Sequence, residues 1–508
     1  MEAFQNLMMG FSVALTPENL LFAFLGSLLG TFLGVLPGVG SVSGMVILIP
    51  LTYHLPPVGA IIMLAAMWYG SNYGGTITSV LMNVPGEGSS AITCVDGYPM
   101  AKQGRAGPAI AISAIGSFVG GTLGTFALVF AAAPLTKVAM EFGPAESFGL
   151  VVLGLSLVSG LAGNSMLKAL IMAAFGLAVG CVGIDPSRGT PRFVFGQMDL
   201  MDGISFVPIC MGLFGLGEIL LNAETIMKPV FVSKIKSLWP TVKDFRDSTW
   251  PIIRGTVIGF FMGLIPGMPA TASSFSSYVA ETKLSRTPEK FGTGMIEGVA
   301  GPETANNSHC QGALVPLFTL GIPASASMAV LMGAFMMNGI IPGPLMFREH
   351  PDVAWGVIAS LYVGNLMLLI LNLPLVGLWV SMLKIPYPIL FAVIVGFMVL
   401  GAYSLENSAF DVGMLLLFGI LGYAFKKLDF PLAPAVLTVI LGPMMERKLV
   451  EALQMSGGNP SILWESWISM TFLGLAAVAL ALPLVRGGLK LRRTSFMELG
   501  KASMARRS

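Results

Sequence analysis

The sequence predicts an all-α polytopic membrane protein, and three observations support that prediction. Of the 508 residues, 55% are hydrophobic and 11% are charged, and the mean hydropathy is +0.81, whereas soluble domains carry roughly 25% charged residues. Apolar stretches of about 17 to 25 residues, long enough to cross a bilayer, recur from end to end with short connections. A series of motifs also occurs twice in the same order, which predicts a chain built from two repeats.

The net charge and the cysteine positions indicate which binding partners and metal sites the chain can have. The net charge of +2 predicts no nucleic-acid partner, and the Lys and Arg residues serve instead as topology signals in a lipid membrane. The first ten residues, MEAFQNLMMG, lack the basic segment of a secretory signal, so we expect the chain to insert through its own spans. The four cysteines lack metal-ligand spacing and are expected to be reduced and without a role: Cys94, Cys181, Cys210 and Cys310.

Three motif pairs indicate the duplication. LGVLPGVG at Leu33 returns as MGLIPGMP at Met262, which aligns Gly38 with Gly267. LMNVPGEGSS at Leu81 matches TLGIPASASM at Thr319, and NSMLKALIMAAFG at Asn164 matches NSAFDVGMLLLFG at Asn407. Three matches in the same order favour a repeat. Any one of them alone would be weak evidence, because the chain has 62 glycines.

The distribution of basic residues predicts the orientation. No Lys or Arg precedes Lys102, whereas the linker after residue 222 is Lys-rich and is expected to be cytoplasmic. The apolar segment 251–279 has basic residues on both sides, so both of its ends are placed in the cytoplasm and it becomes a re-entrant hairpin. Its turn falls at PGMPATASS, because proline lacks a backbone donor and glycine permits positive φ.

The same argument applied to the first copy completes the predicted topology: two inverted repeats, each with a re-entrant hairpin and a broken helix, in about eleven spans plus two hairpins. The predicted parts are a first repeat over 1–222 with a hairpin at 20–50 and a broken span at 58–90, a cytoplasmic linker over 223–250, a second repeat over 251–445 with a hairpin at 251–279 and a broken span at 309–337, and a final span with a basic cytoplasmic tail over 446–508. The other expected spans lie near 108–133, 146–161, 165–183, 203–222, 353–380, 386–404, 408–425, 430–445 and 463–485. Four basic residues fall on the wrong side of this topology: Arg188, Arg192, Arg447 and Lys448.

The predicted binding site lies where the membrane helices are interrupted, namely at the turns of the two hairpins (the tips) and in the two broken spans (the breaks). Non-helical backbone at membrane depth requires protein or a water-filled cavity around it, and paired broken helices in inverted repeats bind substrate and coupling ions in secondary transporters. Helix N-termini at the tips attract carboxylates, and nearby carbonyls and hydroxyls suit Na⁺. The predicted substrate and ion ligands are Pro37, Gly38, Gly40, Ser41, Ser43, Asn83, Pro85, Gly86, Ser89, Ser90, Pro266, Gly267, Thr271, Ser273, Ser274, Asn306, Asn307, Gly321, Pro323, Ser325 and Ser327.

Other interpretations of these motifs stay open. A Pro-Gly kink is often only structural, and small hydroxyl residues also permit close helix packing. In IEGVAGPETANNSHCQG, Glu303 and the two asparagines are either functional intramembrane groups or a helix cap, whereas capping is favoured for Glu297. His309 is a candidate proton relay.

Enzyme classes lack their motifs here. The sequence contains no phosphate loop, no H-E-x-x-H zinc pair and no G-x-S-x-G elbow, and we predict no catalytic residue and no cofactor. An intramembrane protease lacks a matched carboxylate pair, since Glu87 aligns with Ser325. The stronger alternative is an anion- or cation-conducting channel with re-entrant loops.

Five motifs, in order over almost the whole chain, closely resemble one family. GVLPGVG, YGGTITSVLMNVPG, DGYPMAKQGRAG, IEGVAGPETANN and LGIPASAS are similar to those of TctA, the large membrane subunit of the tripartite tricarboxylate transporters. The resemblance implies a bacterial inner-membrane permease that imports citrate or other carboxylates with an ion gradient, commonly Na⁺. It also implies two partners, a small TctB-like membrane subunit and a periplasmic TctC-like solute-binding protein.

Three departures from the family pattern fall in the second half. PGMPATA, GIPASAS and the His309-Cys310 pair replace smaller or more glycine-rich residues, so citrate should not be assumed as the substrate. An elevator-like motion of the hairpins is expected by analogy alone.

Overall fold

The structure, a computed structural model, describes residues 2–36, 38–157, 165–185, 189–224, 237–382 and 387–481. Most of the described chain is helical, which is consistent with the predicted all-α class. The helices of the first half are α1 Glu2–Ala14, α2 Pro17–Val35, α3 Gly40–Thr52, α4 Pro57–Met82, α5 Thr93–Lys102, α6 Ala106–Ala139, α7 Pro144–Leu157, α8 Met166–Gly180, α9 Phe206–Cys210 and α10 Gly217–Ala223, with short 3₁₀ turns η1 Gly88–Ser90 and η3 Met198–Leu200 and a π-helical segment η4 Met211–Leu216.

The second half of the chain, from Val242 on, is also helical. Its helices are α11 Val242–Gly263, α12 Ala270–Leu284, α13 Glu297–Leu320, α14 Ala326–Met337, α15 Met346–Glu349, α16 Pro351–Asn372, α17 Val376–Met382, α18 Tyr387–Glu406, α19 Ala409–Lys427, α20 Ala433–Met455 and α21 Ile462–Glu465, with the 3₁₀ turn η5 Pro288–Lys290. A further apolar helix covers Trp467–Ala481.

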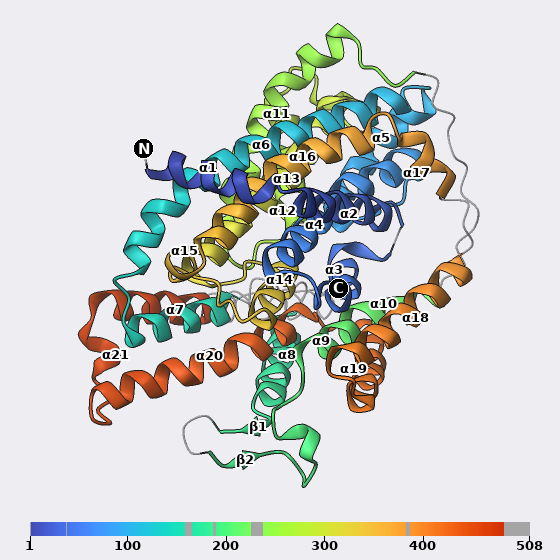
Figure 1. The fold of residues 1–508 in the computed structure, drawn as a ribbon. Coiled ribbons are helices and arrows are strands. Elements are labelled where there is room, and N and C mark those ends of the chain that lie inside the picture. The colour runs from blue at the N-terminus through green and yellow to red at the C-terminus, as the bar shows by residue number, and fades with distance from the viewer. Residues whose placement is uncertain are drawn as a thin grey trace, which may run out of the picture.

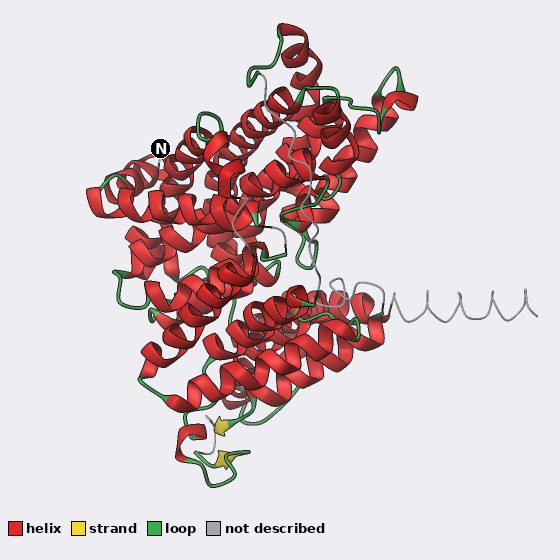
Figure 2. Cartoon of the chain, turned by 90° about the vertical axis from the view of Figure 1, so that its right-hand side faces the viewer, coloured by secondary structure: helices red, strands yellow, loops and turns green. Residues whose placement is uncertain are grey.

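The helices form two groups joined by two short helices (Figures 1 and 2). In the upper group of Figure 1, α2 packs on α4, and α13 lies against α6, α11 and α12. In the lower group, α20 packs on α7 and α8, and α19 packs on η4 and α10. Helices α3 and α14 contact both groups and each other. These two helices follow breaks in the chain, so the breaks lie where the two groups meet.

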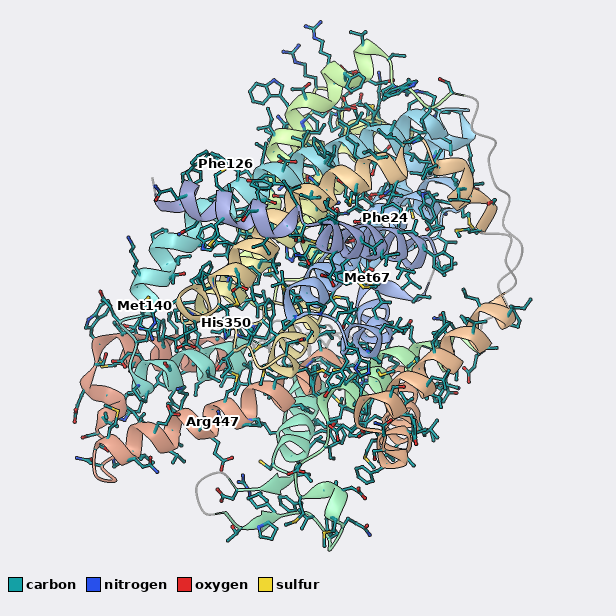
Figure 3. The ribbon with its side chains drawn as sticks, in the orientation of Figure 1. Phe24, Met67, Phe126, Met140, His350 and Arg447 are labelled. Atoms are coloured by element: carbon teal, nitrogen blue, oxygen red, sulfur yellow. The ribbon has the colours of Figure 1, made fainter. Side chains whose placement is uncertain are left out.

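Helices α4 and α13 are the interior of the upper group. Every residue from Gly59 to Leu81 of α4 and from Gly298 to Thr319 of α13 is buried. Both helices are polar for a membrane protein, and buried Ser, Thr and Asn side chains follow one another along them. Neighbouring helices shield them from lipid, so their hydropathy can be low. Figure 3 shows the contrast between buried Met67 of α4 and Phe126, which is 57% exposed on α6.

In the described residues, six helices are long and apolar enough to cross a membrane: Pro17–Val35, Ala106–Ala139, Phe206–Ala223, Pro351–Asn372, Pro388–Glu406 and Ala409–Lys427. Five shorter apolar helices accompany them, among them α3, α7 and α14. This supports a multi-pass membrane protein. The total of about eleven spans remains a prediction. Helices α4 and α13 are not among the six, and both are almost entirely buried inside the protein.

Two helices begin earlier than the predicted end of the linker and the predicted start of the second broken span. The linker was extended to residue 250, but α11 begins at Val242, where Thr241 and Asp244 form a capping box. The polar first turns of α11 resemble a linker in composition, although a T-x-x-D pattern precedes them. The second broken span was started at residue 309, whereas α13 begins at Glu297. Its polar first half is buried by protein, which the hydropathy argument could not anticipate.

Helix α1 and the strands β1 and β2 are among the elements that were not predicted. Helix α1 packs along α16. Strands β1 Gly183–Ile184 and β2 Pro191–Arg192 pair antiparallel at the bottom of Figure 1. Here Arg192 makes two hydrogen bonds to Glu446 of α20, of 2.9 and 3.1 Å. One basic residue that the predicted topology left unexplained therefore has an acidic partner. All four cysteines are free, and residues 482–508, the predicted tail, lie outside the described chain.

Candidate functional site

The two predicted tips have the same backbone turn. Gly38, between α2 and α3, and Gly267, between α11 and α12, both have φ of +85°, a conformation that glycine adopts without steric cost. The two broken helices also end alike, because Asn83 after α4 and Gly321 after α13 are both left-handed, with φ of 58° and 69°. Pro37 lies outside the described residues.

At the first tip, a carboxylate of the protein itself occupies the start of α3. The backbone N–H of Ser41 donates to Glu87 Oε2 over 2.7 Å, and Ser71 Oγ donates to the same oxygen over 3.2 Å. The sequence predicted that these N–H groups would be free for a substrate, and for Ser41 the structure corrects that prediction. Glu87 is an acidic residue within an apolar break. An ionisable residue in a membrane segment often has a functional role, and this pattern could have identified Glu87 from the sequence.

A cavity of about 280 Å³ opens at this tip. Six predicted site residues line it, and so do two charged residues that were not predicted, Glu218 and Lys426, which form an ion pair. These two come from α10 and α19, far from the motifs in sequence, so no local pattern could associate them with the tip. The complete lining is Gly38, Val39, Gly40, Ser41, Val42, Ser43, Pro85, Gly86, Glu87, Gly88, Phe214, Glu218 and Lys426.

Two hydrogen bonds hold the first tip against the lower group. Asn222 Nδ2 donates to the carbonyl of Gly38 over 2.7 Å, and Ser43 Oγ donates to the carbonyl of Phe214 over 2.9 Å. A Cβ atom on Gly38 would approach Asn222 Nδ2 to 2.6 Å. Both the φ angle and the available space therefore require glycine at Gly38.

The second tip is closed by uncharged contacts. The N–H of Gly267 donates to the carbonyl of Ala324 over 2.9 Å. Ser273 Oγ lies 2.8 Å from His309 Nδ1, and Ser274 Oγ donates to the carbonyl of Pro302 over 3.3 Å. The start of α12 is thus attached to both the second break and the middle of α13.

Each tip also meets the break of the other half. Ser41 Oγ and Ser327 Oγ lie 3.5 Å apart, joining the first tip to the start of α14. Thr271 Oγ1 lies beside Gly88, where an added Cβ would be 3.3 Å from it. The structure therefore brings the four breaks predicted from sequence into one region.

Several predicted ligands have structural partners in this region. Ser325 caps α14 by accepting the N–H of Met328 over 3.3 Å, and Ser89 Oγ donates to Asn72 over 2.7 Å. Gly321 has no room for a Cβ, which would lie 2.6 Å from the carbonyl of Pro342. The other predicted residues differ in exposure: Asn83 is exposed, Pro266 is half-buried, and Pro323 and Ser90 are buried. Their role as ligands remains a prediction.

The polar cluster of α13 lies in the interior and not at a helix end. Glu303 is fully buried and accepts hydrogen bonds from Thr76 over 2.6 Å and from Asn306 over 3.0 Å. Asn307 donates to Ser117 over 2.8 Å. Only Glu297 of this motif falls in the first turn, the position that favours a capping role.

Asp96, in the motif DGYPMAKQGRAG, was not a predicted site residue, and it lies in a helix. It is fully buried in α5, where its Oδ1 accepts three backbone N–H groups at 2.8 Å each, and Tyr278 donates to its Oδ2. The three donors belong to the loop between α12 and α13: Gly292, Gly294 and Met295. Asp96 therefore has a structural role in shaping that loop.

Comparison with known proteins gives a family for this arrangement. The family model described as "Tripartite tricarboxylate transporter TctA family" matches residues 20–437, which include both tips and both breaks. The chain belongs to the TctA family. This is a transporter family whose members work in a tripartite system with other subunits.

Two TctA relatives from Agrobacterium vitis are similar in sequence. The first, "Uncharacterized 52.8 kDa protein in TAR-I ttuC' 3'region", is 47% identical over 95% of this chain and 97% of its own length. The second, "Uncharacterized protein in TAR-II ttuC' 3'region", is 46% identical over 45% of this chain and 94% of its own length. No solved structure matches the chain.

Proposed function

We propose that this TctA protein is the permease subunit of a binding-protein-dependent secondary transporter. It imports tricarboxylates or related organic acids across a bacterial inner membrane, driven by a cation gradient, with Na⁺ as the coupling ion, by alternating access. A small TctB-like membrane subunit and a periplasmic TctC-like binding protein complete the system. The observation that carries the proposal is that the tips and breaks of both halves meet in one region, where the first tip and the first break line a cavity that contains a helix N-terminus and Lys426.

The same proposal includes two inverted repeats with re-entrant hairpins. Three parallels support a duplication: the equal φ of Gly38 and Gly267, the left-handed ends of α4 and α13, and the serine caps of two later helices. Those caps are Ser165 before α8 and Ser408 before α19, from the third pair of matched motifs. Inverted repeats place substrate near the membrane midplane, where the breaks then alternate in access.

Transport by the complete system tests the function. The permease, the small subunit and the binding protein are reconstituted in proteoliposomes, and uptake of radiolabelled citrate and a panel of mono-, di- and tricarboxylates is measured. We expect saturable uptake of at least one carboxylate that requires an inward Na⁺ gradient and all three proteins. Current proportional to voltage, without saturation, would instead support the channel alternative.

Cysteine labelling tests the inverted topology. Ser12 of α1 and Ser237 of the linker are both exposed, so single cysteines at these positions can react with a membrane-impermeant maleimide. We expect Ser12→Cys to label from the periplasm and Ser237→Cys from the cytoplasm, because the basic linker is retained inside. Labelling of both from the same side would contradict the inverted arrangement.

A further inference from the structure

The Glu303 carboxylate lies in a cluster of buried polar side chains between α4, α5 and α13, called the Glu303 cluster below. Its Oε2 accepts from Thr76 and Asn306, and its Oε1 accepts from the Thr93 hydroxyl. Ser90 lies close to the same carboxylate without a well-aligned hydrogen bond. The Glu303 cluster therefore combines one carboxylate with side chains from α4, the first break, α5 and α13.

The charge of Glu303 has no cationic partner among the residues that the structure describes, since none of their ion pairs includes it. A carboxylate removed from water loses its solvation, and neutral donors compensate for that loss only in part. Such a site therefore favours the arrival of a positive charge. Membrane transporters use buried carboxylates in this way for ions and protons.

Three other buried carboxylates show what a purely structural carboxylate looks like here. Asp96 is bound by backbone N–H groups, Glu281 by Arg254 with a 2.8 Å bond from Nε, and Asp244 by Arg105 and its capping box. Each is therefore satisfied by a cation or by main-chain amides. Glu303 has only hydroxyl and amide side chains around it, which is the chemistry of an oxygen-lined cation site.

Unused oxygen atoms point to a missing ligand. Ser90 Oγ and Asn307 Oδ1 are buried and have no hydrogen-bond partner, although these residues are only 0% and 1% exposed. Buried polar atoms are nearly always paired with protein or with a bound species. Because Asn307 uses its amide nitrogen toward Ser117 and Asn306, its oxygen remains available as an acceptor.

We propose that Glu303 binds the coupling Na⁺, with oxygen atoms of Thr76, Thr93 and Ser90 completing the site. This inference rests on the proposed function and names the ion site within it. Ser90 follows Glu87 of the cavity in the first break, and Pro302, next to Glu303, accepts a hydrogen bond from Ser274 at the second tip. An ion at Glu303 therefore contacts the first break directly and the second tip through one residue.

Thermal unfolding of the detergent-purified full chain tests the site without transport. The midpoint temperature is measured as NaCl replaces choline chloride at constant ionic strength and pH. We expect a saturable rise with Na⁺ in the wild type, because an ion that binds only the folded state stabilises it. Glu303→Gln should lose the rise, whereas Glu303→Asp should retain it with a Na⁺ midpoint weaker by roughly tenfold.

Glu446→Gln is the matched control, because its carboxylate pairs with Arg192 and is not part of the Glu303 cluster, and its Na⁺ response should equal that of the wild type. Ser90→Ala provides a second site variant if Glu303→Gln does not fold, and it should weaken the Na⁺ response. A full Na⁺ response in Glu303→Gln, or no Na⁺-specific response in the wild type, would overturn the proposal. So would stabilisation by lower pH alone, which would assign the site to a proton.

Failure of the ion site and failure of the transport function give different results. If Na⁺-driven carboxylate uptake survives Glu303→Gln, the proposed ion site is contradicted and the proposed transport function still holds. A Glu303-dependent Na⁺ response in a chain that moves no carboxylate would support the ion site and contradict the proposed transport function.

Discussion

The two tips share a backbone turn but differ in their surroundings. Gly38 and Gly267 have the same φ, yet the first tip lines a cavity with three charged side chains, whereas the second is closed by the carbonyl of Ala324 and by a contact between Ser273 and His309. The break that carries Glu87 at the first tip carries Ser325 at the second. Matched motifs therefore fix where the chain turns, and the side chains around each turn decide whether it can receive a ligand.

From this comparison we propose that the substrate binds at the first tip in the state that the structure shows. Ser41 already donates its N–H to a carboxylate, that of Glu87, with the geometry that a bound substrate would use. A carboxylate substrate can replace Glu87 there, and Lys426 supplies a positive charge in the same cavity. The following predictions test this difference, from the largest expected effect to the smallest.

The glycine of each tip should be indispensable. Gly38→Val and Gly267→Val each place a β-branched residue at φ of +85°, with a strain of about 1 to 3 kcal/mol, and at Gly38 the new side chain also collides with Asn222. We expect both variants to insert normally and to lose uptake, measured as transport per inserted molecule in proteoliposomes.

The control for these variants is Gly396→Val, because Gly396 of α18 has open space around its Cβ position. Gly154, in an ordinary predicted span, is a poorer choice, since a Cβ there would lie 3.2 Å from Ile322 beside the second break. Equal uptake in Gly38→Val, Gly267→Val and Gly396→Val would mean that the tips are only kinks.

Lys426→Met should raise the KM for the transported carboxylate by roughly tenfold, the equivalent of about 1.4 kcal/mol. The substitution removes a positive charge from the cavity and leaves Glu218 without its ion-pair partner. Lys427→Met is the matched control, because Lys427 pairs with Glu224 at 2.8 Å and both side chains are about half exposed. A KM that changes equally in the two variants would argue against a role for Lys426.

Glu87→Gln should lower the KM by roughly fivefold, or about 1 kcal/mol. The amide competes less well than the carboxylate for the Ser41 N–H, and it no longer repels an anionic substrate. The measurement is the concentration dependence of initial uptake, with Glu446→Gln as the control. A raised KM would mean that Glu87 assists the substrate and does not compete with it.

Ser273→Ala should have the smallest effect on transport. Its hydroxyl contacts His309 at the closed second tip, and loss of one buried hydrogen bond destabilises a protein by about 1 kcal/mol. We expect a lower unfolding temperature in detergent and an unchanged KM. A tenfold change in KM would show that the second tip binds substrate in the same state as the first.

The sequence predicts where the chain turns at this site better than it predicts which charged residues line it. Pro-Gly motifs locate both tips and both breaks, because proline and glycine act through local φ and hydrogen bonding. Glu218 and Lys426 reach the first tip from distant helices, and no local rule relates them to it. Helix α1 was missed for a similar reason, since its packing on α16 is a tertiary feature.

Hydropathy missed the first half of α13, where protein replaces lipid. The buried polar helices α4 and α13 are surrounded by other helices, so their composition reflects internal hydrogen bonding and not membrane solvation. For that reason the sequence left open whether Glu303 is a functional intramembrane group or a helix cap, and in the structure it is fully buried. Span counts in such a protein describe its lipid-facing helices and underestimate its core.

Substrate protection of a single cysteine tests the central claim, that the cavity at the first tip binds the carboxylate. Val42 lines this cavity. Val42→Cys is made with the two partly exposed cysteines, Cys94 and Cys181, changed to serine, and its reaction rate with a polar methanethiosulfonate is measured in membranes. A transported carboxylate should slow this reaction at concentrations near its KM and leave Ser237→Cys in the linker unaffected. An unchanged Val42→Cys rate at saturating carboxylate would contradict the account.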